Sequence, residues 1–326
     1  MRHSITSRPQ PVTPSLLALC LCLAASAMTP AAAADALHDL VAGIAPGEAP
    51  KPVLVAEGFE FTEGPAADAS GRVFFSDIPR RKIHLWTVPA GGVKPGDGPF
   101  QVETWLDESG STNGLAFGAD GLLYACQMGE SRRVVAIDPQ TKAIRPLAER
   151  HDGKRFNAPN DLWIDASGAI WFTDPAYGRK PEELELDAEA VWWISPDRAV
   201  VRRVADGFKR PNGIGISPDG KTLYLADRGA DVTWAYEITA PGTLGERRKF
   251  ADSGFDGFAI DERGNLYGTP KAKLVRVHAP DGTSIGEIPL PESPSNVTFA
   301  GPDRKTLVVT VKDKVFALPM KVKGGG

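Results

Sequence analysis

Six polar residues recur at equivalent places along the chain, and their types could bind a metal ion. They are Glu63, Asn113, Asn160, Asn212, Asp256 and Asn296. Asn and Asp often form the turns that precede strands, which would explain any single one of them. Six residues in register, one of them a Glu, favour a site instead. Carboxylate and carboxamide oxygens are the ligands that hard cations prefer, and the absence of His argues against a zinc site of the usual kind.

Each of these residues leads a segment with the same pattern, an apolar strand, a turn and a second strand. The segments align without gaps up to the turn, and successive leaders are 50, 47, 52, 44 and 40 residues apart. In the first five segments a Gly lies eight residues after the leader, while the sixth has Arg304 there. A period of ~40–50 residues with this content and no convincing helix indicates β-propeller blades. The sequence therefore predicts an all-β fold, a six-bladed β-propeller whose leaders ring the mouth of the central channel.

Two further strands are expected near the ends of the mature chain, over residues 52–56 and 314–318. In a propeller, pairing of strands from the two termini completes one blade and removes an exposed sheet edge. A solenoid is the alternative for such repeats. It is disfavoured because capping repeats are lacking and the units carry further strands, such as residues 132–137 and 191–194. We therefore expect a ring closed by strands from both termini, with residues 324–326 disordered.

Residues 1–34 have the features of a cleaved secretory signal peptide. Arg2 and Arg8 give a positive start, residues 16–28 an apolar core and residues 31–34 a small-residue cleavage zone. The apolar core is shorter than the ~20 residues of a membrane span, so cleavage is expected rather than an uncleaved anchor. We expect export to the periplasm or the medium, no membrane attachment after cleavage, and a single propeller domain over residues 35–326.

The composition of the mature chain argues against several classes of protein. The whole chain has a net charge of −4, and loss of Arg2 and Arg8 with the signal makes it −6. A mildly acidic chain without a basic stretch does not suit nucleic-acid binding. Cys126 is the one cysteine left, so no internal disulfide is expected, and its apolar strand indicates a buried thiol. No serine lies in a nucleophile-elbow pattern, which disfavours a serine esterase.

Several motifs resemble the SMP-30/gluconolactonase/LRE-like family of six-bladed propellers, particularly its bacterial gluconolactonase-like members. The resemblance covers roughly residues 55–320. It rests on EGP at 63–65, FSDIPRRKIHLW at 75–86, NGLAFGADGLLYACQ at 113–127, NAPND at 157–161, FTDPAYG at 172–178, RPNGIGISPDGKTLY at 210–224 and DGFAIDERGNLY at 256–267. One departure is Ala66-Ala67, where the family usually has an apolar–aromatic pair after EGP.

The resemblance implies one divalent cation at the channel mouth. Calcium is the cation expected, with Zn²⁺, Mg²⁺ or Mn²⁺ as alternatives. Carried over motif by motif, its protein ligands are Glu63, Asn160, Asn212 and Asp256. These four residues are also leaders of the repeats, which were identified from the sequence itself.

The resemblance also implies hydrolysis of a sugar lactone such as glucono-1,5-lactone. The cation would act as a Lewis acid that polarises the carbonyl and stabilises the oxyanion. Asp256 and Glu63 are the expected catalytic carboxylates, with Asp256 as general base for a water or, as in phosphotriesterase-like relatives, as nucleophile. Binding to a cation lowers the pKa of a carboxylate, so a dual role of Asp256 as ligand and base is a hypothesis to be tested.

The expected partner is a small lactone or ester. The alternatives are a phosphotriesterase-like or arylesterase activity on the same cation, and a non-catalytic, calcium-stabilised propeller that binds a sugar or a partner. Residues 178–190 form a charged insertion that is either a lid or a solvated loop. The candidate substrate-binding residues are Asn113, Arg80, Gln127 and Tyr177, with Arg81 and Arg228 as further residues around the mouth.

Overall fold

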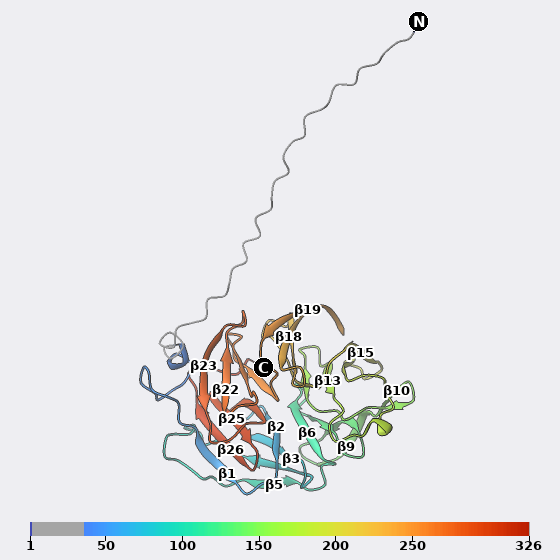
Figure 1. Ribbon diagram of the computed structural model, residues 1–326. Coiled ribbons are helices and arrows are strands. Elements are labelled where there is room, and N and C mark those ends of the chain that lie inside the picture. Colours follow the sequence, from blue (N-terminus) through green and yellow to red (C-terminus); the bar gives the residue numbers. More distant parts are fainter. Residues whose placement is uncertain (2–35, 326) are drawn as a thin grey trace.

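The computed structural model describes residue 1 and residues 36–325, and in them almost all regular structure is β. The predicted signal peptide lies outside these residues, apart from its first residue. Six four-stranded antiparallel sheets surround a central channel as the blades of a propeller (Figure 1). The predicted six-bladed β-propeller is confirmed. No helix in residues 36–325 has the length and apolar character needed to cross a bilayer.

The six repeats found in the sequence are the two inner strands of the six blades. Blades 1 to 3 are β2(Thr62–Ala67) β3(Val73–Asp77) β4(Lys82–Trp86) β5(Glu103–Leu106), β6(Thr112–Phe117) β7(Leu123–Gln127) β8(Arg133–Ile137) β9(Ile144–Ala148), and β12(Leu162–Ile164) β13(Ile170–Asp174) β14(Ala190–Ile194) β15(Val201–Asp206). Blades 4 to 6 are β16(Pro211–Ile216) β17(Thr222–Asp227) β18(Val232–Ala240) β19(Thr243–Ala251), β20(Phe258–Ile260) β21(Leu266–Gly268) β22(Leu274–His278) β23(Ser284–Pro289), and β24(Asn296–Ala300) β25(Thr306–Val311) β26(Lys314–Pro319) β1(Val53–Glu57).

The turn between the inner strands follows from an Asp that all six repeats contain and a Gly that the first five share. In blade 3 the Asp165 carboxylate accepts hydrogen bonds from the backbone N–H groups of Ser167 and Ala169. Gly168 closes this turn with φ +84°, a left-handed conformation that glycine adopts without strain. The turn then returns the chain as β13, paired in register with β12. Local chemistry thus sets the length of the inner hairpin, and with it the position of the residue that leads it.

Strands from both termini close the ring, as predicted. The sixth blade has the strand order β1-β26-β25-β24, so an N-terminal strand forms its outer edge (Figure 1). The Thr62 hydroxyl of blade 1 also donates to the carbonyl of Lys314, a residue 252 positions away. A solenoid would leave its two ends apart, so this pairing excludes the alternative.

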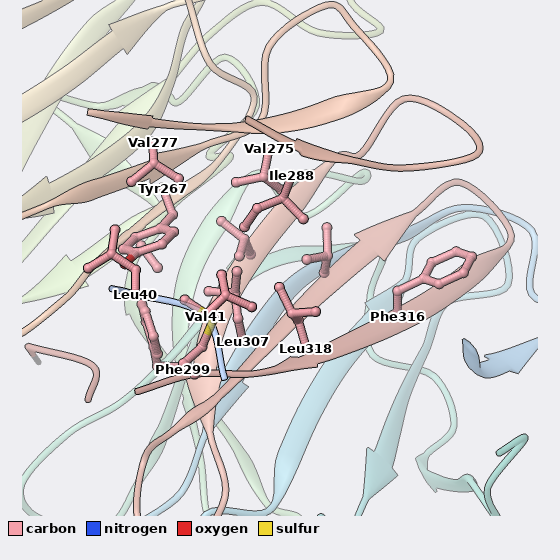
Figure 2. Close-up of a cluster of buried hydrophobic side chains, with 14 of the residues drawn as sticks. Leu40, Val41, Tyr267, Val275, Val277, Ile288, Phe299, Leu307, Phe316 and Leu318 are labelled. Atoms are coloured by element: carbon pink, nitrogen blue, oxygen red, sulfur yellow. The ribbon is translucent and has the colours of Figure 1, made fainter. Parts of the chain in front are cut away.

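Hydrophobic side chains pack between neighbouring blades and form the core. Figure 2 shows the cluster between blades 5 and 6, which includes Tyr267, Val275 and Phe299. Leu40 and Val41 join this cluster from a segment that precedes β1. The backbone of this segment is fixed as well, because the N–H of Lys321 donates to the carbonyl of Leu40. The segment therefore fastens the beginning of the described chain to its last blades.

The C-terminal segment is ordered further than the sequence predicted. Gly324 forms a β-bridge with Asp261, and the N–H of Gly325 donates to the carbonyl of Ile260. The expectation of disorder is therefore wrong for residues 324 and 325, because backbone hydrogen bonds to the end of β20 hold them. Gly324 also lines a cavity of about 330 Å³ in the channel. Ala66 and Ala67 line the same cavity, where their small side chains leave space.

Candidate functional site

The structure places four leaders at the start of innermost strands and the other two just before them. Glu63, Asn113 and Asn212 are the second residues of β2, β6 and β16, and Asn296 is the first residue of β24. Asn160 and Asp256 each stand two residues before their strands, β12 and β20. The innermost strands contact one another in sequence around the ring. The leaders therefore meet at one end of the channel, as the register of the repeats predicted.

Glycines after four of the leaders allow the blades to approach this closely. A Cβ on Gly64, whose φ is +46°, would stand 2.1 Å from the carbonyl oxygen of Asn113 in the next blade. A Cβ on Gly257 would stand 2.1 Å from the side chain of Asn296. Gly114 and Gly213 likewise face the start of the following blade. Each of these glycines makes room for the next leader, so they set the width of the polar ring.

Hydrogen bonds connect the leaders in pairs. The Asn212 amide donates to Asp256 Oδ1 at 2.6 Å and to the Tyr177 hydroxyl at 3.2 Å. The Asn296 amide donates to Glu63 Oε2 at 3.2 Å, and this oxygen also accepts the N–H of Gly64. Each of the two carboxylates is thus oriented by a carboxamide from a neighbouring blade. The family resemblance assigned no role to Asn296; its position as a leader is the signal that pointed to it.

Of the acidic groups at the mouth, Glu63 and Asp161 are buried and Asp256 is half-buried, and their charges act on one another. Burial, and next the negative charge of Asp256, hold the pKa of Glu63 well above its usual value. Burial raises the pKa of Asp256 to about 6, although the Arg228 guanidinium and the Asn212 hydrogen bond oppose this rise. Burial also raises the pKa of Asp161 to about 7. A cation at this place would stabilise the ionised forms of these carboxyl groups.

Asp161 is a third acid at the mouth, itself buried, that the predicted ligand set did not contain. It follows Asn160, accepts a hydrogen bond from the N–H of Leu162, and lines the channel cavity. The charge of Asp161 also contributes to the raised pKa of Glu63. Its place beside a leader was the signal available in the sequence. The structure adds its burial and its closeness to Glu63.

The donor chemistry of the predicted ligands fits a hard cation. In residues 36–325, no three His, Cys, Asp or Glu side chains lie close enough together to hold a metal by themselves. Two of the four predicted ligands are carboxamides, so the site cannot be recognised from a cluster of carboxylates alone. Asn160 is only 3% exposed, and its side chain makes no hydrogen bond to another described residue. The buried Glu63 carboxylate, the half-buried Asp256 carboxylate and an amide without a partner form an oxygen-rich group suited to such an ion.

Two of the four predicted substrate residues, Tyr177 and Asn113, lie at the mouth. The other two, Gln127 and Arg80, are engaged in hydrogen bonds to other parts of the protein. Tyr177 contacts the leaders through Asn212, and burial raises its pKa to about 12, so its hydroxyl stays protonated. Asn113 is buried at the mouth, and its amide contacts the sulfur of Met128 at 3.6 Å. Gln127 has both ends of its amide occupied, by the carbonyl of Ser109 and by Arg133, which favours a structural role. Arg80 donates to the carbonyl of Gly58 and is partly exposed.

The charged insertion, residues 178–190, is fixed to the neighbouring strands. It contains the short helix η1 (Pro181–Glu183), whose last carbonyl accepts a hydrogen bond from Arg132 at 2.9 Å. Glu185 accepts the N–H of Arg155, and Asp187 forms an ion pair with Arg203 at 2.8 Å. These contacts favour an anchored loop at the rim over a freely solvated one. A role as a lid stays a prediction.

The fold and this polar group together define a class of protein, the six-bladed propellers with oxygen-rich side chains at the channel mouth. A family model described as the SMP-30/Gluconolactonase/LRE-like region matches residues 61–313. The chain therefore belongs to the SMP-30/gluconolactonase/LRE-like family.

Individual relatives support this assignment. A gluconolactonase of Zymomonas mobilis is 30% identical over 293 residues, which are 83% of this chain and 82% of that protein. The solved structure of a gluconolactonase from Xanthomonas campestris aligns with a TM-score of 0.75 and 32% identity, covering 87% of this chain and 92% of that one. A second solved structure, described as a candidate gluconolactonase, aligns with a TM-score of 0.78 and 29% identity and covers 90% and 98% of the two chains. The chain is thus similar to lactonases over most of its length.

Proposed function

We propose that this protein is an exported, divalent-metal-dependent lactonase that opens a sugar lactone. The observation that carries the proposal is the group of oxygen donors at the channel mouth, in which Glu63, Asn160 and Asn212 are buried, Asp256 is half-buried, and the two carboxyl groups have raised pKa values. The similarity to gluconolactonases from two bacteria supports the lactone as substrate. Calcium is the cation we favour, because carboxylate and carboxamide oxygens are its usual ligands.

In this proposal the cation, when bound to these four side chains, supplies Lewis-acid polarisation of the lactone carbonyl. Asp256, whose carboxylate is oriented by the Asn212 amide, takes a proton from the attacking water. The proton then passes to the ring oxygen as the C–O bond breaks, which gives the hydroxy acid. Tyr177 and Asn113 lie at the mouth where they can hold substrate hydroxyls.

The decisive test is hydrolysis of glucono-1,5-lactone by the mature protein before and after chelation. We expect the rate above the spontaneous background to disappear with chelator and to return with calcium or another divalent ion, while the circular dichroism of the folded protein persists. A chelator-resistant rate would contradict the metal requirement. No rate with any ion would refute the lactonase and favour the calcium-stabilised binding propeller.

The role of Asp256 is tested separately with Asp256→Asn. We expect a loss of activity that persists at saturating metal, when occupancy is measured directly by calorimetry or by bound-metal analysis. Full activity at full occupancy would show that Asp256 is neither base nor nucleophile. If Asp256→Asn weakens metal binding but has no other effect on activity, Asp256 is only a ligand.

An arylesterase-like activity on the same cation is the second candidate. Rat serum paraoxonase/arylesterase 1 is 43% identical to this chain, although only over 79 residues, 24% of the chain. Parallel assays with an aryl ester and a phosphotriester would rank these substrates against the lactone. Export from the cytoplasm is part of the proposal, and a periplasmic protein whose N-terminus begins near residue 35 would support it.

A further inference from the structure

Arg228 stands beside Asp256 in a manner that a structural ion pair does not explain. Its Nη2 lies 3.2 Å from Asp256 Oδ2, and its side chain is 20% exposed. Its Nη1 is buried and has no hydrogen-bond partner in residues 36–325. A guanidinium that serves only to pair with a carboxylate commonly uses two N–H groups in a fork. A buried, charged donor without a partner is costly, so this one indicates an acceptor that arrives with a ligand.

The backbone that carries Arg228 is held rigidly. Arg228 follows Asp227 at the end of β17, and the Asp227 carboxylate accepts N–H groups from Lys209, Arg210 and Ala230. The N–H of Arg228 itself donates to the carbonyl of Arg210. The loop that leads into β16 and the turn that follows β17 are thus tied to one buried carboxylate. These hydrogen bonds hold the backbone of Arg228 so that its side chain keeps a fixed place relative to Asp256.

The two oxygens of Asp256 locate the guanidinium relative to the proposed cation. Asn212, a proposed ligand, contacts Oδ1, while Arg228 contacts Oδ2. The guanidinium and the proposed ligand Asn212 therefore contact opposite oxygens of the same carboxylate, which places Arg228 next to the four proposed ligands. A carbonyl oxygen that approached a cation held by these four residues would also come near the Arg228 guanidinium.

We propose that Arg228 donates from Nη1 to the carbonyl oxygen of the substrate and stabilises the oxyanion during hydrolysis; this inference rests on the proposed lactonase function. The water oxygen bonds to the carbonyl carbon, the π pair moves to the carbonyl oxygen, and the water proton goes to Asp256. The oxyanion then re-forms the C=O bond, the bond to the ring oxygen breaks, and the ring oxygen takes the proton. Arg228 donates a hydrogen bond throughout and neither gives up nor takes a proton in this balance. A preorganised donor in a site that excludes water acts most strongly on the charge of the transition state.

The test compares Arg228→Gln and Arg228→Lys with the wild type, in kcat, in KM and in divalent-metal affinity. Loss of one oxyanion donor costs about 10²–10³-fold in kcat, so Arg228→Gln should lose about this much with KM changed less than about threefold. Arg228→Lys, which keeps the charge but not the fork, should lose less. Metal affinity of Arg228→Gln should be equal or higher, because a positive charge beside the cation is removed.

Arg276→Gln is the matched control. Arg276 is also a partly buried arginine, and it makes two hydrogen bonds to Glu287 between β22 and β23. We expect it to keep the wild-type kcat. The inference is overturned if wild type is active and Arg228→Gln keeps kcat within about twofold, or if its loss is restored by saturating metal. Absence of lactone hydrolysis by the wild type would instead refute the proposed function, and with it this role.

Discussion

At the scale of single residues, the bond between Asn296 and Glu63 joins the last blade to the first. The Asn296 amide fixes one oxygen of a carboxylate that we propose as a ligand. Outer partners of metal ligands commonly affect metal affinity by about 10–100-fold. We predict that Asn296→Ala weakens divalent-metal binding by this factor while the protein remains folded. Isothermal titration of the metal-free protein measures the change.

Asn265→Ala is the control for this prediction. Asn265 is another buried asparagine, and its amide donates to the carboxylate of Asp261 at 2.8 Å, beside the turn after β20. It should lower the free energy of unfolding without changing metal affinity. Equal metal affinities of Asn296→Ala and the wild type would show that the bond to Glu63 does not prepare the ligand.

The raised pKa of Asp161, about 7, predicts how stability depends on pH. A carboxyl group whose pKa is higher in the folded state binds a proton more tightly there than in the unfolded chain. Its contribution to stability is therefore present at low pH and is lost as the pH rises from about 4 to about 7. Asp256 and Glu63, whose pKa values are also raised, act in the same direction.

We predict that urea unfolding of the chelated wild type gives a lower free energy at about pH 7 than at about pH 5. Asp161→Asn, which does not titrate, should show a smaller decrease over the same range. Added divalent cation should reduce the decrease in the wild type, because it stabilises the ionised carboxylates. A pH dependence unchanged by Asp161→Asn would contradict the assignment.

Much of the candidate site followed from the sequence because each leader has a fixed place in its repeat. The register alone placed Glu63 and Asp256 at the same end of the channel. It gave no partners for their side chains, since these come from neighbouring blades that are far apart along the chain. The buried charge of Asp161 and the unpartnered nitrogen of Arg228 were therefore visible only in the folded protein.

At the scale of elements, the close approach of β2 and β6 depends on Gly64. We predict that Gly64→Ala destabilises the protein by about 3 kcal/mol or more, since its Cβ would overlap the backbone of Asn113. Gly168→Ala is the matched change. Gly168 also has a positive φ, but a Cβ there meets nothing within 4 Å, so only strain of about 1 kcal/mol is expected. If thermal unfolding shows similar losses of stability for the two variants, backbone strain rather than the contact between blades accounts for the effect of Gly64→Ala.

The inner hairpins were predictable as elements because turn residues and apolar strands are local signals. The short pair β10 (Arg150–His151) and β11 (Lys154–Arg155) carries little apolar pattern and was not predicted. The order of residues 324 and 325 was missed for another reason. Their hydrogen bonds go to Ile260 and Arg304, and a run of glycines says nothing about such distant partners.

At the scale of the whole molecule, the pairing of β1 with β26 holds the ring together. Val55 of β1 is fully buried between blades 6 and 1. We predict that Val55→Asp lowers the free energy of unfolding by about 4 kcal/mol or more, because it buries a charge without a partner. Val200→Asp is the control, since Val200 is 47% exposed, and it should stay within about 0.5 kcal/mol of the wild type. Equal stability of the two variants would mean that β1 is dispensable.

The closed ring also has a consequence for the order of assembly. Blades 1 to 5 are each made of one continuous stretch of chain, so they can form as that stretch becomes available. Blade 6 combines β1 with β24 to β26, so β1 can pair only after the last strands of the chain are available. Until then β1 lacks its partner and β2 lacks the neighbour on one side, which leaves apolar surface open to other chains. Ring closure is therefore the step that buries the apolar surface of β1 and β2.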